Sequence, residues 1–238
     1  MSVSLDRAGA TVLLALTGVV VLGSVPSCST ASAASRSDEQ SDLELRLGQE
    51  VFQELESKGQ IVASSSLYEV LGPIAARITQ AAQPRYEHPF QFYLVHQTQP
   101  NAFSTPGGNV YVADSLLHFV KNEEELAGTL CHEVAHTIHH DTVSLMERRE
   151  RLAHREAGAG VLIGPTPVHL LAIALVGKLN SLGYSREAES RADVTGSDIC
   201  AAARYDPWGL VWLFSDFKEA QIGETPELLS DHPDDDHR

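Results

Sequence analysis

His132-Glu133-Val134-Ala135-His136 lies in the middle of a helical pattern. A helix that rises about 1.5 Å and turns about 100° per residue places His132 and His136 on one face, one turn apart. Both imidazoles can then bind a single tetrahedral Zn²⁺ ion. Glu133 lies beside them, where its carboxylate can take a proton from a water that the metal activates, without being a ligand itself. The motif predicts metal-assisted hydrolysis of peptide bonds, with one zinc ion per chain as the cofactor.

The residues around this motif predict the helix that it needs. Asn122 is a favourable N-cap residue, and the three glutamates at 123–125 suit the positive end of the helix dipole. Apolar residues at helical spacing form a stripe that can be buried, namely Leu126, Leu130, Val134 and Ile138. We therefore expect a helix over residues 123–139 with the motif in its interior.

A zinc peptidase site needs a third protein ligand, and a second helical segment supplies candidates. Glu189 and Asp193 are four residues apart, so one carboxylate can bind the metal while the other accepts the N–H of a ligand imidazole. Glu187 has the same spacing from Arg191 and suits an ion pair on a solvent-facing surface. Spacing alone does not separate Glu187 from Glu189 as the metal ligand.

Several motifs in order along the chain resemble one family of metallopeptidases. They are LELRLG at 43–48, NAFSTPGGNVYV at 101–112, HEVAH at 132–136, YSR at 184–186, YDP at 205–207 and SDHP at 230–233. Together they resemble the gluzincin metallopeptidases of the HtpX, BepA and CAAX prenyl endopeptidase type. The resemblance is closest to the exported branch represented by BepA, which is related to mitochondrial Oma-type peptidases. The tetratricopeptide repeats of BepA are not found in this sequence.

This resemblance implies roles for further residues. In that family an ExxxD motif follows HExxH, which implies Glu189 as the third ligand and Asp193 as the partner of His132. The hairpin that begins at Asn101 is implied to bind an extended peptide along its edge strand, with Gly107-Gly108 allowing a close approach of backbone.

The end of the chain carries two more implied roles. His232 is implied as a latch that takes the fourth zinc position in a resting enzyme, and Arg238 as a group that stabilises the oxyanion. The alternative for His232 is a solvent-exposed acidic tail. This chain reads His139-His140-Asp141 where the family often has Arg-His, and these additional imidazoles offer further metal contacts.

Patterns along the whole chain predict an α+β fold, mostly helical and zincin-like, with a small sheet or hairpin beside the motif helix. Further helices are expected over residues 42–58, 67–82, 115–120, 142–157, 185–204 and 207–220. A strand at 89–96, a turn at Pro106-Gly107-Gly108 and a second strand from Asn109 form the expected sheet. Residues 157–177 carry no charge, but Pro165 and Pro167 favour a loop and a buried helix over a membrane span or contact.

The first 33 residues predict an export signal. The apolar core, Val12 to Leu22, is shorter than the roughly 20 residues that a spanning helix needs, and small residues follow it. Cleavage before Cys28, with lipidation of that cysteine, and cleavage after Ala33 both remain open, as does a retained anchor. Residues 34–42 are expected to form a flexible tether, and residues 43–238 a single metallopeptidase domain.

Composition excludes one class of partner and raises a question about cysteines. The formal charge is −15, from 17 Lys+Arg against 32 Asp+Glu, which argues against nucleic-acid binding because such binding neutralises phosphates with cations. Cys131 and Cys200 would lie in an oxidising compartment, where disulfides form. Cys200 is three turns, about 16 Å, beyond Glu189, so we expect the two sulfurs to be too far apart to bond.

The sequence therefore predicts a zinc-dependent endopeptidase of the bacterial cell envelope, located in the periplasm and attached to a membrane if Cys28 is lipidated. Unfolded or misassembled proteins are the expected substrates, as in protein quality control. A zinc-stabilised chaperone or assembly factor for outer-membrane proteins, with incidental proteolysis, is the alternative. The variant Glu133→Gln separates the two, because only an assembly role would survive it.

Overall fold

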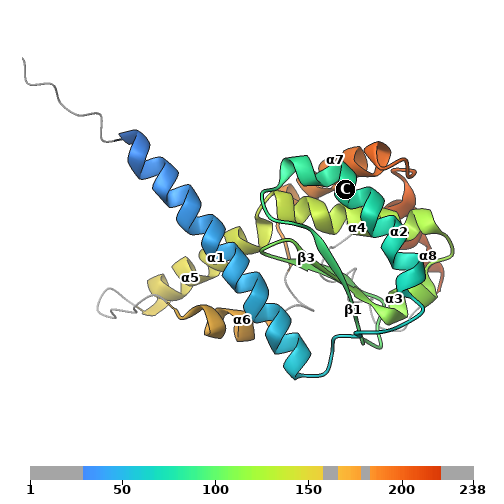
Figure 1. Cartoon of the computed structure of the whole chain (residues 1–238), viewed down its shortest axis with the longest axis horizontal. Coiled ribbons are helices and arrows are strands. Elements are labelled where there is room, and N and C mark those ends of the chain that lie inside the picture. Colours follow the sequence, from blue (N-terminus) through green and yellow to red (C-terminus); the bar gives the residue numbers. More distant parts are fainter. Residues whose placement is uncertain (1–28, 158–165, 178–182, 221–238) are drawn as a thin grey trace, which may run out of the picture.

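A small sheet between two groups of helices forms the centre of the molecule (Figure 1). The structure is a computed structural model that describes residues 29–157, 166–177 and 183–220. Its helices are α1 Ser29–Ser57, α2 Tyr68–Ala82, the short 3₁₀ helix η1 Gln83–Arg85, α3 Asp114–Phe119, α4 Glu123–Ile138, α5 Asp141–Ala157, α6 Val168–Val176, α7 Arg186–Ala202 and α8 Gly209–Glu219. Its strands are β1 Gln91–Val95, β2 Ala102–Thr105 and β3 Asn109–Ala113. The predicted α+β class is confirmed.

The sheet has the strand order β1-β3-β2, with β3 in the centre. β1 runs parallel to β3, and β2 runs antiparallel to it through a tight turn at Gly107 and Gly108. The sequence pattern predicted β1 and β3, whereas β2 was implied only by the family resemblance, as the first strand of the hairpin that begins at Asn101. β2 has only four residues and all four are buried, so it lacks the polar and apolar alternation that indicates a half-exposed strand.

Successive side chains of β3 contribute to two separate hydrophobic cores. Val110 and Val112 face the core that they share with α2, α4, α7 and α8. Tyr111 points to the other side, into a core with α1 and α6, where its ring stacks on Phe103 of β2. Side chains alternate between the two faces of a strand, which accounts for this arrangement. The helix that carries HExxH, α4, packs against the core that contains Val110 and Val112.

The turn between β2 and β3 packs against the molecule's own backbone. Gly107 and Gly108 have φ values of 83° and 90°, a region that other residues rarely adopt. A Cβ atom on Gly107 would lie 3.1 Å from the Glu44 carbonyl oxygen, and one on Gly108 would lie 2.4 Å from that of Pro89. Backbone therefore does approach these glycines closely, from α1 and from Pro89 of the chain itself, and their role in binding a substrate peptide stays a prediction.

Helix α1 is longer than the sequence predicted. It begins at Ser29, so residues 34–42 continue the helix where a flexible tether was expected. The segment 29–42 contains neither glycine nor proline, and alanine, arginine, glutamate and glutamine within it favour a helix once the following turns are packed. The cleavage site before Cys28 lies outside the described residues.

Helix α6 lies beside α1 and has one buried and one exposed face (Figure 1). Ala172 and Leu175 are buried against α1, whereas Leu170 and Ile173 are each 47% exposed. The predicted helix is thus present, but it is only partly buried, and one apolar face lies at the surface. Among the described residues, no helix combines the length and apolar character needed to cross a lipid bilayer.

Candidate metal centre

Helices α4 and α7 bring three potential metal ligands together. His132 and His136 come from α4 and Glu189 from α7, and one donor atom of each lies within 4.8 Å of the others. All three side chains are buried. Both helices start at side-chain caps: Asn122 accepts the N–H of Glu125 on α4, and Ser185 does the same for α7.

A carboxylate lies beside Nδ1 of each of the two histidines. Nδ1 of His132 lies 3.0 Å from Oδ1 of Asp193, and Nδ1 of His136 lies 2.9 Å from Oδ2 of Asp141. A carboxylate accepts only, so each Nδ1 carries the proton and each Nε2 presents a lone pair. The two Nε2 atoms are 3.0 Å apart, and Glu189 oxygens lie 3.4 and 3.6 Å from them. Two lone pairs and a carboxylate that converge repel one another unless a cation lies among them, so the donor set fits a metal ion.

Glu189, rather than Glu187, faces the two histidines. Glu189 is buried, while Glu187 lies in the first turn of α7 at the surface. Asp193 lies one turn after Glu189 and contacts His132, as the ExxxD resemblance implied. The motif residue Glu133 is 1% exposed and sits on the same helix as the two histidines.

Asp141 is a site residue that the sequence analysis missed. Its Oδ1 accepts a hydrogen bond of 2.7 Å from Arg191, the residue that was expected to pair with Glu187. Asp141 follows the end of α4, where helical spacing no longer indicates which direction a side chain takes. Its position depends on the turn between α4 and α5, which no local pattern predicts.

Tyr184 closes the buried side of the centre. Its ring stacks on the imidazole of His136, and its hydroxyl shares a hydrogen bond of 2.7 Å with Thr142. Burial, and then the negative charge of Glu133, raise the pKa of Tyr184 above its usual value of 10. The hydroxyl is therefore neutral at physiological pH and acts as a hydrogen-bonding group.

A glycine allows α7 to lie directly against α4. A Cβ atom on Gly196 would lie 3.1 Å from the Cα atom of His132 and 3.2 Å from the carbonyl group of Cys131. Contacts this close leave no room for a side chain. The backbone of α7 therefore packs against the backbone of α4 next to a ligand.

The two described cysteines are neighbours, which contradicts the sequence-based expectation. Both are free and buried, and contact with Cys200 adds to burial in raising the pKa of Cys131. Cys200 also donates a hydrogen bond of 3.4 Å to the carbonyl of Ala127. The sequence analysis estimated the distance between the sulfurs from the distance of Cys200 to Glu189 along the helix. In the structure, Gly196 rather than Glu189 lies opposite Cys131, and Cys200 follows Gly196 by only one helical turn.

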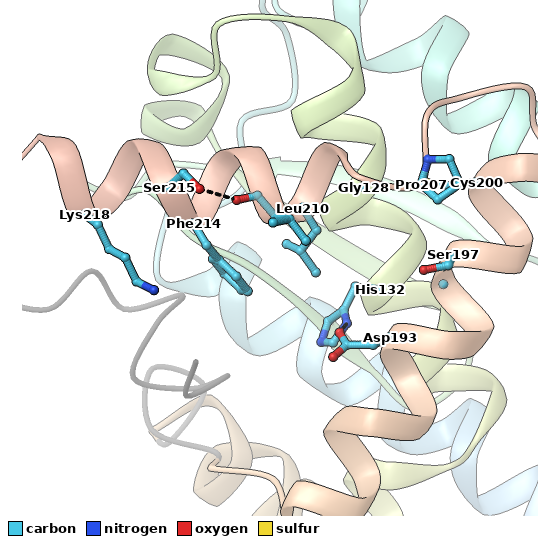
Figure 2. Close-up of a pocket in the computed structure, with 12 residues that line it drawn as sticks. Gly128, His132, Asp193, Ser197, Cys200, Pro207, Leu210, Phe214, Ser215 and Lys218 are labelled. Carbon is cyan, nitrogen blue, oxygen red and sulfur yellow. Dashed lines mark hydrogen bonds and ion pairs between the residues drawn. The ribbon is translucent and has the colours of Figure 1, made fainter. Parts of the chain in front are cut away.

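A cavity of about 400 Å³ adjoins the centre between α4, α7 and α8. Figure 2 shows His132 and Asp193 pointing toward one another at one end, with Leu210 and Phe214 of α8 along another wall. Lys218 lies further along the same helix. The cavity thus combines one ligand of the centre with an apolar wall.

Other predicted site residues lie elsewhere. The additional imidazoles do not join the ligands: Nε2 of His139 lies 2.8 Å from the Thr195 hydroxyl, and Nδ1 of His140 lies 2.7 Å from Glu44. Asn101 is buried just before β2, an edge strand that packs against α4. The predicted latch His232 and oxyanion group Arg238 lie outside the described residues.

The family model of Peptidase family M48 matches residues 65–238, which include HExxH, Glu189 and Asp193. The chain belongs to this family. The resemblance inferred from the motifs is thereby confirmed. The match covers both ligand-bearing helices, α4 and α7.

Curated relatives point to the same branch. The chain is 26% identical over 220 residues to a beta-barrel assembly-enhancing protease of Yersinia pestis, covering 88% of this chain and 44% of the relative. It is 24% identical over 200 residues to the protein of that name from Escherichia coli (strain K12), covering 80% and 41%. It is 29% identical over 149 residues to the mitochondrial metalloendopeptidase OMA1 of Schizosaccharomyces pombe, covering 60% and 43%. The chain spans less than half the length of these relatives.

Proposed function

We propose that this chain is a zinc-dependent endopeptidase. The observation that carries the proposal is the convergence of two imidazole lone pairs and one carboxylate, with the buried Glu133 on the same helix. Two histidines and one carboxylate are a ligand set that catalytic zinc sites use, with a position left for water or substrate. His132, His136 and Glu189 would hold the ion.

The chemistry divides between the ion and this chain's side chains. When bound, zinc supplies a Lewis acid that polarises the substrate carbonyl and makes water more acidic. Glu133 accepts the proton of the attacking water on its carboxylate and delivers it to the nitrogen of the leaving amine. Asp193 and Asp141 keep each histidine in the tautomer whose Nε2 is unprotonated. Glu133, Asp141 and Asp193 are placed before substrate arrives.

Two features support an extended polypeptide as the substrate. β2 is at an edge of the sheet and packs against α4, so a peptide strand that displaces what buries this edge could add to it near the ligands, with Asn101 at one end. The cavity beside His132 could receive an apolar side chain against Leu210 and Phe214. Because folded proteins seldom offer an extended backbone, unfolded or misassembled proteins suit this site.

We assign the protein to the bacterial envelope, in the periplasm, with lipidated Cys28 as a membrane attachment. The apolar core at residues 12–22 and the names of the bacterial relatives support this assignment. Cys28→Ser should release the protein from the membrane fraction, because the acyl chains supply the anchoring. A membrane fraction that stays unchanged would exclude lipidation at Cys28.

Metal analysis and digestion of an unfolded protein test the proposed activity. Wild type should contain one zinc ion per chain and cut casein, and Glu133→Gln should keep the zinc and lose about 10²–10⁴-fold in rate, as expected for a general base. Glu56→Gln, an exposed change of the same kind on α1, is the control. Cleavage by Glu133→Gln at the wild-type rate would overturn the role of Glu133 as the general base. A Glu133→Gln variant that loses cleavage but still complements the wild-type protein in the cell would favour an assembly factor.

A further inference from the structure

A buried carboxylate on α1 is bonded to the turn that follows the ligand-bearing helix. Glu44 is 2% exposed, and both of its oxygens lie within 2.9 Å of Nδ1 of His140. The Tyr86 hydroxyl donates a third hydrogen bond, of 3.1 Å, to Glu44. A carboxylate this buried needs such partners, so the contact between α1 and His140 is a fixed one.

His140 has a backbone conformation that needs support. It lies between α4 and α5 with φ of 54°, a left-handed value that non-glycine residues seldom adopt. Such conformations persist where the surroundings hold them. The bond to Glu44 adds to the backbone hydrogen bonds of His140 with Thr137 and Ser144 in supporting this conformation, which sets the direction of the next residue, Asp141.

Asp141 uses each of its oxygens for a different partner. Oδ2 accepts from the ligand His136 at 2.9 Å, and Oδ1 accepts from Arg191 of α7 at 2.7 Å. Asp141 is 3% exposed, so water does not compete for either bond. The Asp141 carboxylate therefore orients the imidazole of His136. Arg191 of α7 bonds this carboxylate directly, and Glu44 of α1 acts on it through the turn at His140.

We propose that Asp141 and Glu44 are positioning residues for the metal ligand His136, and that Glu44 acts through His140 and Asp141. The inference rests on the proposed zinc site and adds α1 to it, although Glu44 precedes the residues 65–238 that the family model matches. Carboxylates behind a ligand histidine fix its ring and tautomer, and their loss typically weakens metal binding about 10–100-fold. Weak binding of zinc is thus the expected signature, whatever the substrate.

The test is a double-mutant cycle on the affinity for Zn²⁺ alone, measured by chelator competition with the full chain. Asp141→Asn should raise the dissociation constant about 10–100-fold, and Glu44→Ala by a smaller factor of about tenfold. The double variant should bind no more weakly than Asp141→Asn, because Glu44 acts through Asp141. Glu56→Gln should bind as wild type does. Thermal unfolding of each metal-free variant reports any loss of fold.

His140→Ala keeps the test decisive if Glu44→Ala does not fold. Alanine loses the bond to Glu44, while the left-handed conformation of this residue still needs support. It should weaken zinc binding as Glu44→Ala does. Unchanged zinc affinity in both Glu44→Ala and the His140 variant would overturn the role of Glu44. A double variant of Glu44 and Asp141 whose loss of affinity equals the product of the two single losses would overturn it too. Zinc binding without peptide cleavage would overturn only the proposed activity, and a wild type that binds no zinc would overturn both.

Discussion

The phenol ring of Tyr184 lies on the imidazole ring of His136, with ring centroids 4.2 Å apart and planes inclined by 17°. The stack covers one face of the His136 ring, and the Tyr184 hydroxyl is bonded to Thr142. Tyr184 therefore stabilises the fold through two separable contributions, ring packing and one hydrogen bond.

Two substitutions separate these contributions. Tyr184→Phe keeps the stack and should cost about 1 kcal/mol of unfolding free energy for the lost hydrogen bond. Tyr184→Ala removes a buried ring and should cost about 3–5 kcal/mol. Urea unfolding of the metal-free protein measures both. Equal losses for the two variants would show that the ring packing contributes nothing.

Gly196→Ala should lower stability although alanine is the better helix former. A Cβ at this position meets the backbone of α4 at 3.1–3.2 Å, and overpacking of this kind typically costs about 1–3 kcal/mol. Gly72→Ala in α2 is the matched control, because no atom lies within 4 Å of its added Cβ. The control should gain about 0.5–1 kcal/mol. Thermal melts that rise for both variants would contradict the close contact of α4 with α7.

The third ligand can be tested by metal content. Glu189→Ala should lose zinc on dialysis, because it removes one of three protein ligands, while Glu187→Ala should retain it. Both substitutions remove one carboxylate from the first turns of α7, so the comparison is matched in charge. Equal zinc content would exclude Glu189 as a ligand.

Stability should depend on the protonation of His140. Its hydrogen bond to Glu44 is the main cause that raises the pKa of His140 above 6.5. The charges of Glu87 and Asp141 also raise this pKa, while partial burial lowers it. The imidazolium form then stabilises the fold fully below the unfolded-state pKa of about 6.5. This contribution is lost as pH rises through the higher folded-state pKa.

The difference in melting temperature between wild type and His140→Gln isolates this group from the other histidines. That difference should shrink from about pH 6 upward as His140 loses its proton. The metal-free protein should be used, so that zinc release does not contribute. A difference that is constant with pH would exclude the effect.

The predicted latch is testable by activity. His232→Ala should raise basal peptidase activity at unchanged zinc content, because an imidazole that competes for the fourth position would be removed. Unchanged activity would indicate an acidic tail without a latch. A fall in activity would instead assign His232 to the transition state.

Local signals predicted the elements that carry the ligands. Asn122 and Ser185 marked the starts of α4 and α7, and the ExxxD resemblance selected Glu189 over Glu187, as the structure places them. The caps and the helical spacing of the candidate ligands are encoded within a few residues, whereas the choice of Glu189 came from the family resemblance.

Contacts between distant segments were not predictable in the same way. Asp141, the contact of Cys131 with Cys200, and the short strand β2 all depend on how separate elements pack. Gly196 was the one available signal for the close helix contact, since an interior glycine weakens a helix unless packing requires it.

The metal-binding residues come from two helices separated by more than forty positions in the chain, and α7 completes the centre. During synthesis, His132 and His136 leave the ribosome before Glu189 and Asp193 exist. A partly made chain can offer only two imidazoles to a metal and has no third ligand. The hydrolytic centre can therefore form only after α7 has been synthesised, which keeps the growing polypeptide inactive toward its neighbours.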